Sequence, residues 1–381
     1  MPAASAPSRS HEPLTIVGAG PAGLAAAIVA VQSGRPVVVH ERRETVGARF
    51  HGDFQGLENW TTEGSVLDEL GALGVRDDFA RVPFHEFVVF DPDGREHAVR
   101  SADPIFHIVS RGPGPDTLDR ALEAQARAAG VELRFGSAVQ APPPGSLLAT
   151  GPGAGHGDTI AVGFVFATDM PDGTFAAFHD DLAPFGYSYL ITCRGRGTVA
   201  STIFGRFDRR EQALARTVAF FERAAGLRMR DARRMAGVGS CLARPRLQTG
   251  EVLHAGESAG LQDALFGFGI RNAIVSGALA ARALCEGRPA AYARAWNERL
   301  AGRLASSRVN RLLFARAGHL GYRWFARHLS GAPDGRAWLR RFYAPSPWKS
   351  LAAPLATRLM PRATAVRLVA PSAAPTLEQA L

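Results

Sequence analysis

The stretch LTIVGAGPAGL, residues 14–24, decides the fold of this chain of 381 residues. The apolar run over residues 15–17 is typical of a buried parallel strand. A helix is expected next, over residues 21–31, and Pro21 suits its first turn, where the missing N–H costs nothing. This order predicts the start of a parallel sheet and a helix whose N-terminus faces an anionic ligand.

Three glycines give the turn its chemistry. Gly18 allows a tight turn, Gly20 lets backbone N–H groups approach a pyrophosphate, and Gly23 lets the helix pack closely. A second apolar strand, residues 36–40, ends at Glu41. This acid lies 23 residues after Gly18, close to the roughly 20 expected for a carboxylate that holds the adenosine ribose. The sequence therefore predicts a dinucleotide-binding turn.

Residues 14–34 carry no charge, but their glycines, Pro21 and the strand that ends in an acid argue against a membrane-spanning helix. Residues 1–13 hold one arginine and no apolar run, so we expect a disordered leader and no secretory signal. We expect a cytoplasmic protein, and a peripheral position on the inner membrane stays open.

The cysteines argue against a disulfide-linked or metal-binding protein, and the positive charge is concentrated in the C-terminal part of the chain. Cys193, Cys241 and Cys285 are scattered, which predicts a reducing compartment without disulfides, and no spacing resembles a metal site. From residue 299 to residue 376 the chain has thirteen arginines and its only lysine, Lys349, against one acid, Asp334. That segment therefore carries +13, the whole chain +9, and the remainder −4.

The coarse pattern along the chain predicts an α/β protein. Helices are expected over residues 61–74, 115–130, 211–225 and 271–285. Strands are expected over residues 84–90, 96–99, 131–135, 147–151 and 252–254, with an antiparallel sheet between residues 159 and 204. Residues 46–60 are expected to form a loop, and helices with proline breaks should follow residue 287.

A second glycine-bearing segment, HAGESAGLQDALFGFGIRNA, occupies residues 254–273. Together with the Ser-Gly pair at residues 276–277, it resembles the signature of FAD-dependent oxidoreductases that share the fold of aromatic hydroxylases and geranylgeranyl reductases. Glu257 stands where this family usually has Asp, which bonds the ribityl chain of FAD. The resemblance implies that the turn 266–270 faces the flavin ring from a helix N-terminus.

The resemblance covers about residues 14–285 and implies further cofactor contacts. An arginine of the stretch 41–50 would contact the FAD adenosine or the flavin edge, Arg111 would precede a helix of the cofactor domain, and backbone near Val139 would meet adenine. The implied cofactor-binding residues are Gly18, Gly20, Pro21, Ala22, Gly23, Glu41, Arg42, Arg49, Arg111, Val139, Gly256, Glu257, Gly267, Gly269 and Ile270.

The resemblance also implies the domain organisation. We expect a Rossmann-like FAD-binding domain of the GR2 type, a mainly antiparallel substrate domain inserted into it, and a C-terminal helical region. The FAD-binding domain is assigned to residues 14–50, 104–150 and 245–287, and the substrate domain to residues 51–103 and 151–244. The basic helical region is assigned to residues 288–370 and a disordered tail to residues 371–381.

Departures from the family's sequence motifs argue against some of its enzyme classes for this chain. Aromatic hydroxylases usually carry an Asp-Gly motif after the strand near residue 148, whereas this chain has LLATGPG over residues 147–153. Flavin halogenases use an early lysine and a WxWxIP motif, and this chain has neither. No second GxGxxG turn occurs, so a dedicated NAD(P)H domain is not expected.

The middle of the chain favours a reductase. Residues 183–191 and 195–201 are similar to a strand pair of geranylgeranyl reductases that covers an isoprenoid-binding cavity, although Tyr189 replaces a tryptophan. Tyr187 and Tyr189 are candidates for lining that pocket, and no catalytic side chain is identified beyond the flavin itself.

The leading hypothesis is reduction of a carbon–carbon double bond in an isoprenoid or other hydrophobic substrate. A flavin-dependent monooxygenase, a redox-neutral enzyme such as a lycopene-type cyclase, and an FAD-binding electron carrier remain alternatives. The electron donor, NADPH or a partner such as a ferredoxin, is undecided.

Residues 310–350 alternate aromatic side chains and arginines at helical spacing. Such a helix can lie in a membrane interface and meet anionic head groups, and the alternative is a solvated basic face packed on the flavin domain. No nucleic-acid recognition motif occurs, so nucleic acid is not an expected partner.

Overall fold

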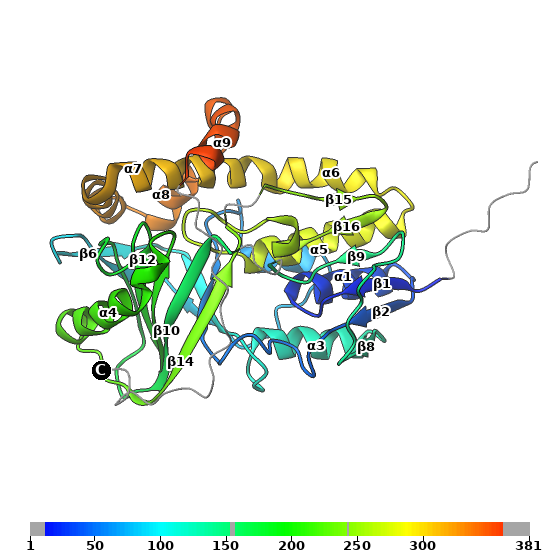
Figure 1. Cartoon of the computed structure of the whole chain (residues 1–381), viewed down its shortest axis with the longest axis horizontal. Helices are drawn as coiled ribbons and strands as arrows, with labels where there is room; N and C mark the ends of the chain where they lie inside the picture. The colour runs from blue at the N-terminus through cyan, green and yellow to red at the C-terminus, as the bar shows by residue number, and fades with distance from the viewer. Residues whose placement is uncertain (1–11, 153–156, 242–243, 361–381) are drawn as a thin grey trace, which may run out of the picture.

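The structure, a computed structural model, describes residues 12–152, 157–241 and 244–360. Most of the predicted leader, residues 1–11, and the whole predicted tail, residues 371–381, lie outside these ranges. The described residues form two large sheets, a small third sheet and a layer of C-terminal helices along the top of Figure 1. The predicted α/β fold is confirmed.

The first sheet contains the glycine-rich turn and has the strand order β15-β16-β9-β1-β2-β8. Its central strand β1 (Leu14–Val17) pairs in parallel with β2 (Val37–His40) and with β9 (Leu147–Leu148). β16 (Val252–His254) and β8 (Glu132–Arg134) extend it in parallel, and β15 (Gln248–Thr249) is an antiparallel edge. The carboxyl ends of the parallel strands therefore meet at one edge.

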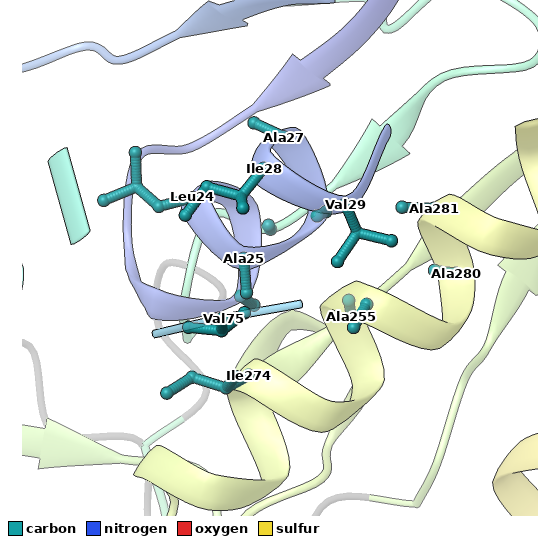
Figure 2. Close-up of a cluster of buried hydrophobic side chains, with 14 of the residues drawn as sticks. Leu24, Ala25, Ala27, Ile28, Val29, Val75, Ala255, Ile274, Ala280 and Ala281 are labelled. Atoms are coloured by element: carbon teal, nitrogen blue, oxygen red, sulfur yellow. The ribbon is translucent and has the colours of Figure 1, made fainter. Parts of the chain in front are cut away.

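The helices α1 (Pro21–Gln32) and α5 (Ile270–Cys285) approach each other closely. A Cβ atom at Gly277 would lie 2.1 Å from the carbonyl oxygen of Ala22. Figure 2 shows side chains of both helices in one buried cluster, with small residues such as Ala25 and Ala280 among them. Glycine and alanine on the facing surfaces let the two backbones come together.

The second sheet has the order β14-β10-β13-β12-β11-β5-β6, and its neighbours are antiparallel except for β11 and β5. Its strands are β5 (Glu86–Phe90), β6 (Glu96–Arg100), β10 (Thr159–Ala167), β11 (Gly173–Ala177), β12 (Tyr187–Cys193), β13 (Arg196–Ile203) and β14 (Arg230–Gly239). Helix α4 (Arg210–Ala225) packs on this sheet through a cluster that includes Phe164, Leu190 and Phe221.

Three further strands form the third sheet, in the order β3-β7-β4: β3 (Phe54–Glu58), β4 (Val82–Phe84) and β7 (Phe106–Ser110). Helix α2 (Val66–Ala72) follows β3, and α3 (Leu118–Ala128) follows β7.

The C-terminal layer consists of α6 (Ala290–Trp296), a π-helical turn (Asn297–Ala301), α7 (Gly302–Ser330), α8 (Gly335–Phe342) and α9 (Pro347–Leu359). Gly318, with φ 49° and ψ −138°, interrupts the helical backbone of α7. Figure 1 shows α6 and α7 running along the top of the molecule, with α9 projecting above them. None of the helices in the described ranges combines the length and apolarity that crossing a membrane requires.

Several sequence-based predictions were wrong in detail. Residues 54–58 form β3 inside the predicted loop 46–60, because they pair with β7, whose residues follow some fifty positions later. Strand β14 was not predicted, since its sequence RDARRMAGVG is highly charged. It lies at a sheet edge, where charged residues are common.

The helix boundaries also differ from the predicted ones. Ser65 caps α2, its Oγ accepting from the N–H of Leu67 at 3.1 Å, so the helix starts five residues later than predicted. Thr117 caps α3, so this helix starts at Leu118, three residues later than predicted. Pro354 lies inside α9 instead of ending it.

We expect Gly277→Ala to destabilise the protein by about 2 kcal/mol, because the new methyl group would push α5 away from the backbone of α1. Urea unfolding measures the change. Gly71→Ala is the matched control, since nothing lies within 4 Å of a Cβ there and Ala favours the helix. Equal stability of Gly277→Ala and the unsubstituted chain would contradict the close packing.

Candidate functional site

The glycine-rich turn opens into a cavity at the carboxyl edge of the first sheet, here called the glycine-loop cavity. Both glycine-bearing segments line it, although they lie more than two hundred residues apart. Its lining includes these predicted cofactor residues: Gly18, Gly20, Pro21, Ala22, Glu41, Arg42, Arg49, Arg111, Glu257, Gly267, Gly269 and Ile270.

The turn has the backbone that an anion site requires. Gly18 has φ +107°, and a Cβ there would lie 2.4 Å from the carbonyl oxygen of Ala149. At Gly20 nothing lies within 4 Å of a Cβ, so a side chain would project into the cavity. The N-terminus of α1 starts at this point, and its free N–H groups and dipole favour a phosphate.

Glu41 is held against the turn. Its Oε2 accepts a hydrogen bond from the N–H of Ala19 at 2.9 Å, and its Oε1 accepts one from the N–H of Arg43 at 3.0 Å. The carboxylate is therefore fixed at the cavity end where a ribose hydroxyl would bind.

Glu257 lines the same cavity from the short helical turn Gly256–Ala259. Its Oε2 accepts from Nη1 of Arg49 at 3.1 Å, and its Oε1 accepts from the N–H of Ser240 at 3.0 Å. The two predicted contacts Arg49 and Glu257 thus bind each other, and both border the cavity.

Arg111 forms a buried, two-point ion pair. Its Nε and Nη2 donate to the carboxylate of Asp119 at 2.8 and 2.9 Å, and its Nη1 donates to Oε1 of Gln55 at 3.2 Å. Burial alone would raise the pKa of the Asp119 carboxyl, but the Arg111 guanidinium holds that pKa below its usual range. The two-point ion pair fixes both side chains in the lining of the glycine-loop cavity.

The turn before α5 is organised by Asp263, which the sequence analysis did not single out. The N–H of Asp263 donates to the carbonyl oxygen of Phe268 at 2.8 Å. Its Oδ2 accepts from the N–H of Phe266 at 2.7 Å and from the hydroxyl of Tyr343 at 3.2 Å. The sequence feature that could have identified Asp263 is that it is the only acid in the mainly apolar stretch 259–270.

A second cavity lies on the other side of this turn, here called the aromatic cavity. It shares Arg49, Phe50, Gln55, Gln262, Gly267, Gly269 and Ile270 with the first. Its walls are mostly apolar and include Phe54, Trp60, Phe87, Phe106, Phe175, Phe178, Tyr187, Tyr189, Phe266, Phe268, Phe325 and Leu329. The two cavities therefore meet at the turn 267–270.

Tyr187 and Tyr189 lie in this aromatic wall, on β12. The Tyr187 hydroxyl donates to the carbonyl oxygen of Phe266 at 2.6 Å. Burial raises the pKa of both phenols, so both keep their protons at neutral pH.

Three predicted cofactor residues do not line either cavity. Gly23 and Gly256 lie behind the glycine-loop cavity, where Cβ atoms would meet the carbonyl oxygen of Gly18 at 1.9 Å and Cβ of Ala22 at 2.9 Å. Val139 follows β8 and is outside the lining.

A small cavity of about 20 Å³ lies beside the turn before α5, and its lining includes the ionisable residues Glu58, Asp263 and Arg303. Oε2 of Glu58 and Oδ1 of Asp263 are buried and have no hydrogen-bond partner in the described part of the chain. Burial raises the pKa of Glu58 to about 7, although Arg271 opposes the shift. The space suffices for about one water molecule.

The described residues contain no cluster of three or more His, Cys, Asp or Glu side chains that could hold a metal ion. Cys241 lines the aromatic cavity, and burial raises the pKa of its thiol.

Comparisons with known proteins agree with this architecture. A family model described as an NAD(P)-binding Rossmann-like domain matches residues 16–60. No curated protein sequence matches the chain. Among solved structures, a geranylgeranyl bacteriochlorophyll reductase-like protein from Thermoplasma acidophilum is similar with a TM-score of 0.66 and 17% identity, over 91% of this chain and 97% of that one.

Two other solved structures extend the likeness. The flavin-dependent brominase Bmp2 has a TM-score of 0.64 and 17% identity, over 91% of this chain and 98% of its own. A 2-methyl-3-hydroxypyridine-5-carboxylic acid oxygenase has a TM-score of 0.57 and 18% identity, over 88% of this chain and 100% of its own. The chain has the fold of the FAD-dependent oxidoreductases. The chain is about equally similar to a reductase-like protein, a brominase and an oxygenase, so the comparisons show its fold and not which of these reactions it catalyses.

We expect the stability of the protein, relative to Glu58→Gln, to fall by up to about 3 kcal/mol as the pH rises from about 5 to 8. The folded-state pKa of about 7 lies above the ordinary 4.5, so the folded chain favours the protonated acid. Between about pH 4.5 and 7 the unfolded chain ionises this acid while the folded chain keeps its proton, so folding loses free energy until both are ionised above pH 7. The neutral amide of the variant avoids this loss. Urea unfolding of both proteins across this pH range measures the difference. A pH-independent difference would show that Glu58 does not titrate inside the folded protein.

Proposed function

We propose that this protein is an FAD-dependent oxidoreductase that acts on a hydrophobic organic substrate, with reduction of a carbon–carbon double bond as the favoured reaction. The observation that supports the proposal is that the glycine-loop cavity and the aromatic cavity meet at one glycine-rich turn, residues 267–270. A cofactor in the first cavity would thus reach a substrate in the second.

The residues present fit FAD. The open space at Gly20 and the N-terminus of α1 suit the pyrophosphate, and Glu41 suits the adenosine ribose. Glu257 and Arg49 border the middle of the cavity, where the family acid meets the ribityl chain. Gly267, Gly269 and Ile270 face both cavities, as a segment beside a flavin ring must.

When bound, FAD supplies hydride transfer to or from an organic substrate. The chain's own residues position and shield the reaction. The N-terminus of α5, at Ile270, favours negative charge on a group beside it. The aromatic walls exclude water, and Tyr187 is fixed by its bond to the carbonyl oxygen of Phe266.

The apolar lining of the aromatic cavity favours a hydrophobic substrate, an isoprenoid chain being one that fits its chemistry. A monooxygenase is the second candidate, because the similarity to an oxygenase spans that whole protein. A halogenase is disfavoured, since the only lysine, Lys349, donates to the carbonyl oxygen of Phe342 and lines neither cavity.

An anaerobic titration with NADPH, followed at the visible flavin band, tests the proposal. A purified protein that takes up no FAD would refute it. Bleaching by NADPH shows direct acceptance of nicotinamide, and oxygen consumption coupled to substrate hydroxylation then separates a monooxygenase from a reductase. A yellow protein that NADPH leaves oxidised requires another donor, such as a ferredoxin.

We expect Gly20→Ala to weaken FAD binding at least about tenfold while folding stays intact, because the new methyl group projects into the phosphate cradle and meets no protein atom. Isothermal titration of FAD into apoprotein measures the affinity. Gly71→Ala, equally open but far from the cavity lining, should bind FAD normally. Normal FAD binding by both variants would show that the cofactor does not bind at this turn.

We expect Ala176→Phe to fill part of the aromatic cavity. The variant should keep its flavin, but its kcat/KM for a bulky substrate should fall at least about tenfold. Ala98→Phe, on an exposed position of β6, is the matched control. Steady-state kinetics and the flavin-to-protein ratio give the two readouts. Unchanged kinetics in Ala176→Phe would place the substrate elsewhere.

A further inference from the structure

The large exposed apolar side chains of the described residues all belong to two helices of the C-terminal layer. They are Leu313, Leu320 and Trp324 on α7, and Trp348, Leu351, Leu355 and Leu359 on α9. Leu351 is 83% exposed and Leu320 is 76% exposed, so these side chains stand well clear of the protein surface. A cluster of this kind marks an interaction surface.

The exposed residues of α9 form one stripe. Trp348, Leu351, Leu355 and Leu359 follow spacings of three and four, which place them on a single helix face. The opposite face holds α9 on the protein, because Ala353 and Ala356 pack against Val309 of α7. In Figure 1 α9 projects from the top of the molecule, so its outer face meets solvent.

Contacts through the C-terminal layer connect the two groups of exposed residues. The Trp324 ring lies 6.4 Å from that of Phe342. Nζ of Lys349 lies 5.8 Å from the same Phe342 ring and 5.9 Å from the Trp348 ring. Tryptophan and lysine at the margin of an apolar surface are typical of proteins at a bilayer interface.

The charge around this surface is positive. Between residues 299 and 360 the only acid is Asp334, and its carboxylate already accepts hydrogen bonds from Ser101 and from the N–H of Ala337. Arg316, Arg341 and Arg358 are exposed and form no ion pair within the described ranges. An apolar stripe rimmed by unpaired arginines complements anionic lipid head groups above an acyl layer.

Several aromatic side chains of the segment 310–350, which was predicted to contact a membrane, are buried in the protein core. Phe314, Tyr322 and Phe325 are buried in a core cluster with Phe178, and Arg311 is buried between the rings of Phe204 and Phe314. These residues cannot reach a membrane. The face that remains exposed includes α9, most of which lies beyond the predicted segment 310–350.

We propose that the outer face of α7 and α9 docks this protein onto the surface of an anionic membrane, with the leucines of α9 inserted below the head groups. The same layer supplies Phe325, Leu329 and Leu339 to the aromatic cavity. Docking on this face would place that cavity beside the lipid. The docking itself is independent of the reaction that the flavin site performs.

Flotation of the full-length, flavin-loaded protein with phosphatidylglycerol-containing vesicles, and with phosphatidylcholine vesicles, tests the proposal. We expect strong binding to the anionic vesicles and a decrease of about fivefold for Arg358→Gln. The double variant Leu351→Gln/Leu355→Gln should lose about tenfold in affinity per leucine. Ala215→Gln and Arg223→Gln, at exposed positions of α4, are the matched controls and should bind normally.

Flavin content and unfolding curves show that each variant is folded, and they need no enzyme activity. Absence of binding by the unsubstituted protein, or equal binding by the leucine double variant, would overturn the proposal. A dimer in size-exclusion chromatography that the double variant converts to a monomer, without vesicle binding, would assign the face to a second copy and also overturn it. If the protein does not bind FAD, the same flotation of the full-length protein, with unfolding curves alone as the check on folding, still decides the proposal.

Discussion

The backbone-to-backbone approach of α1 and α5 is the constraint on which the rest of the structure depends. The two helices begin at the glycine-rich turn and at the turn 267–270, and both starting points line one cavity. They reach this arrangement only because Gly277 faces the Ala22 carbonyl group and Gly256 faces its methyl group, with no room for larger residues. The N-termini of the two helices therefore line the same cavity, where their positive ends favour an anionic group.

Elements whose signal is local were predictable from the sequence. β1, the turn, α1 and β2 occur in the expected order, and Glu41 accepts a hydrogen bond from the backbone of the turn. β3 and β14 were missed because they are strands by virtue of partners far along the chain, and their own sequences contain glycine or charge. Tertiary pairing overrides local propensity in such strands.

The same distinction applies to the site. The glycines and Glu257 stand in recognisable motifs, whereas Gln55, Glu58 and Asp263 have roles only through contacts with distant residues such as Arg111 and Tyr343. Helical periodicity in the C-terminal region identified helices correctly but could not show which face of α7 is covered. That depends on Phe178 and β6, which the pattern of α7 does not contain.

The polar contact between Tyr343 and Asp263 makes the C-terminal layer part of the site. Asp263 holds the turn at which the two cavities meet, and its carboxylate also accepts a hydrogen bond from the Tyr343 hydroxyl at the end of α8. The Trp60 ring adds an edge contact to Phe268 at 4.9 Å and lies 6.0 Å from the Tyr343 ring. Because buried polar groups are costly to leave unpaired, displacement of α8 would release both the carboxylate and the turn. The turn at which the two cavities meet is therefore braced by the end of α8, which belongs to the same C-terminal layer as α7 and α9.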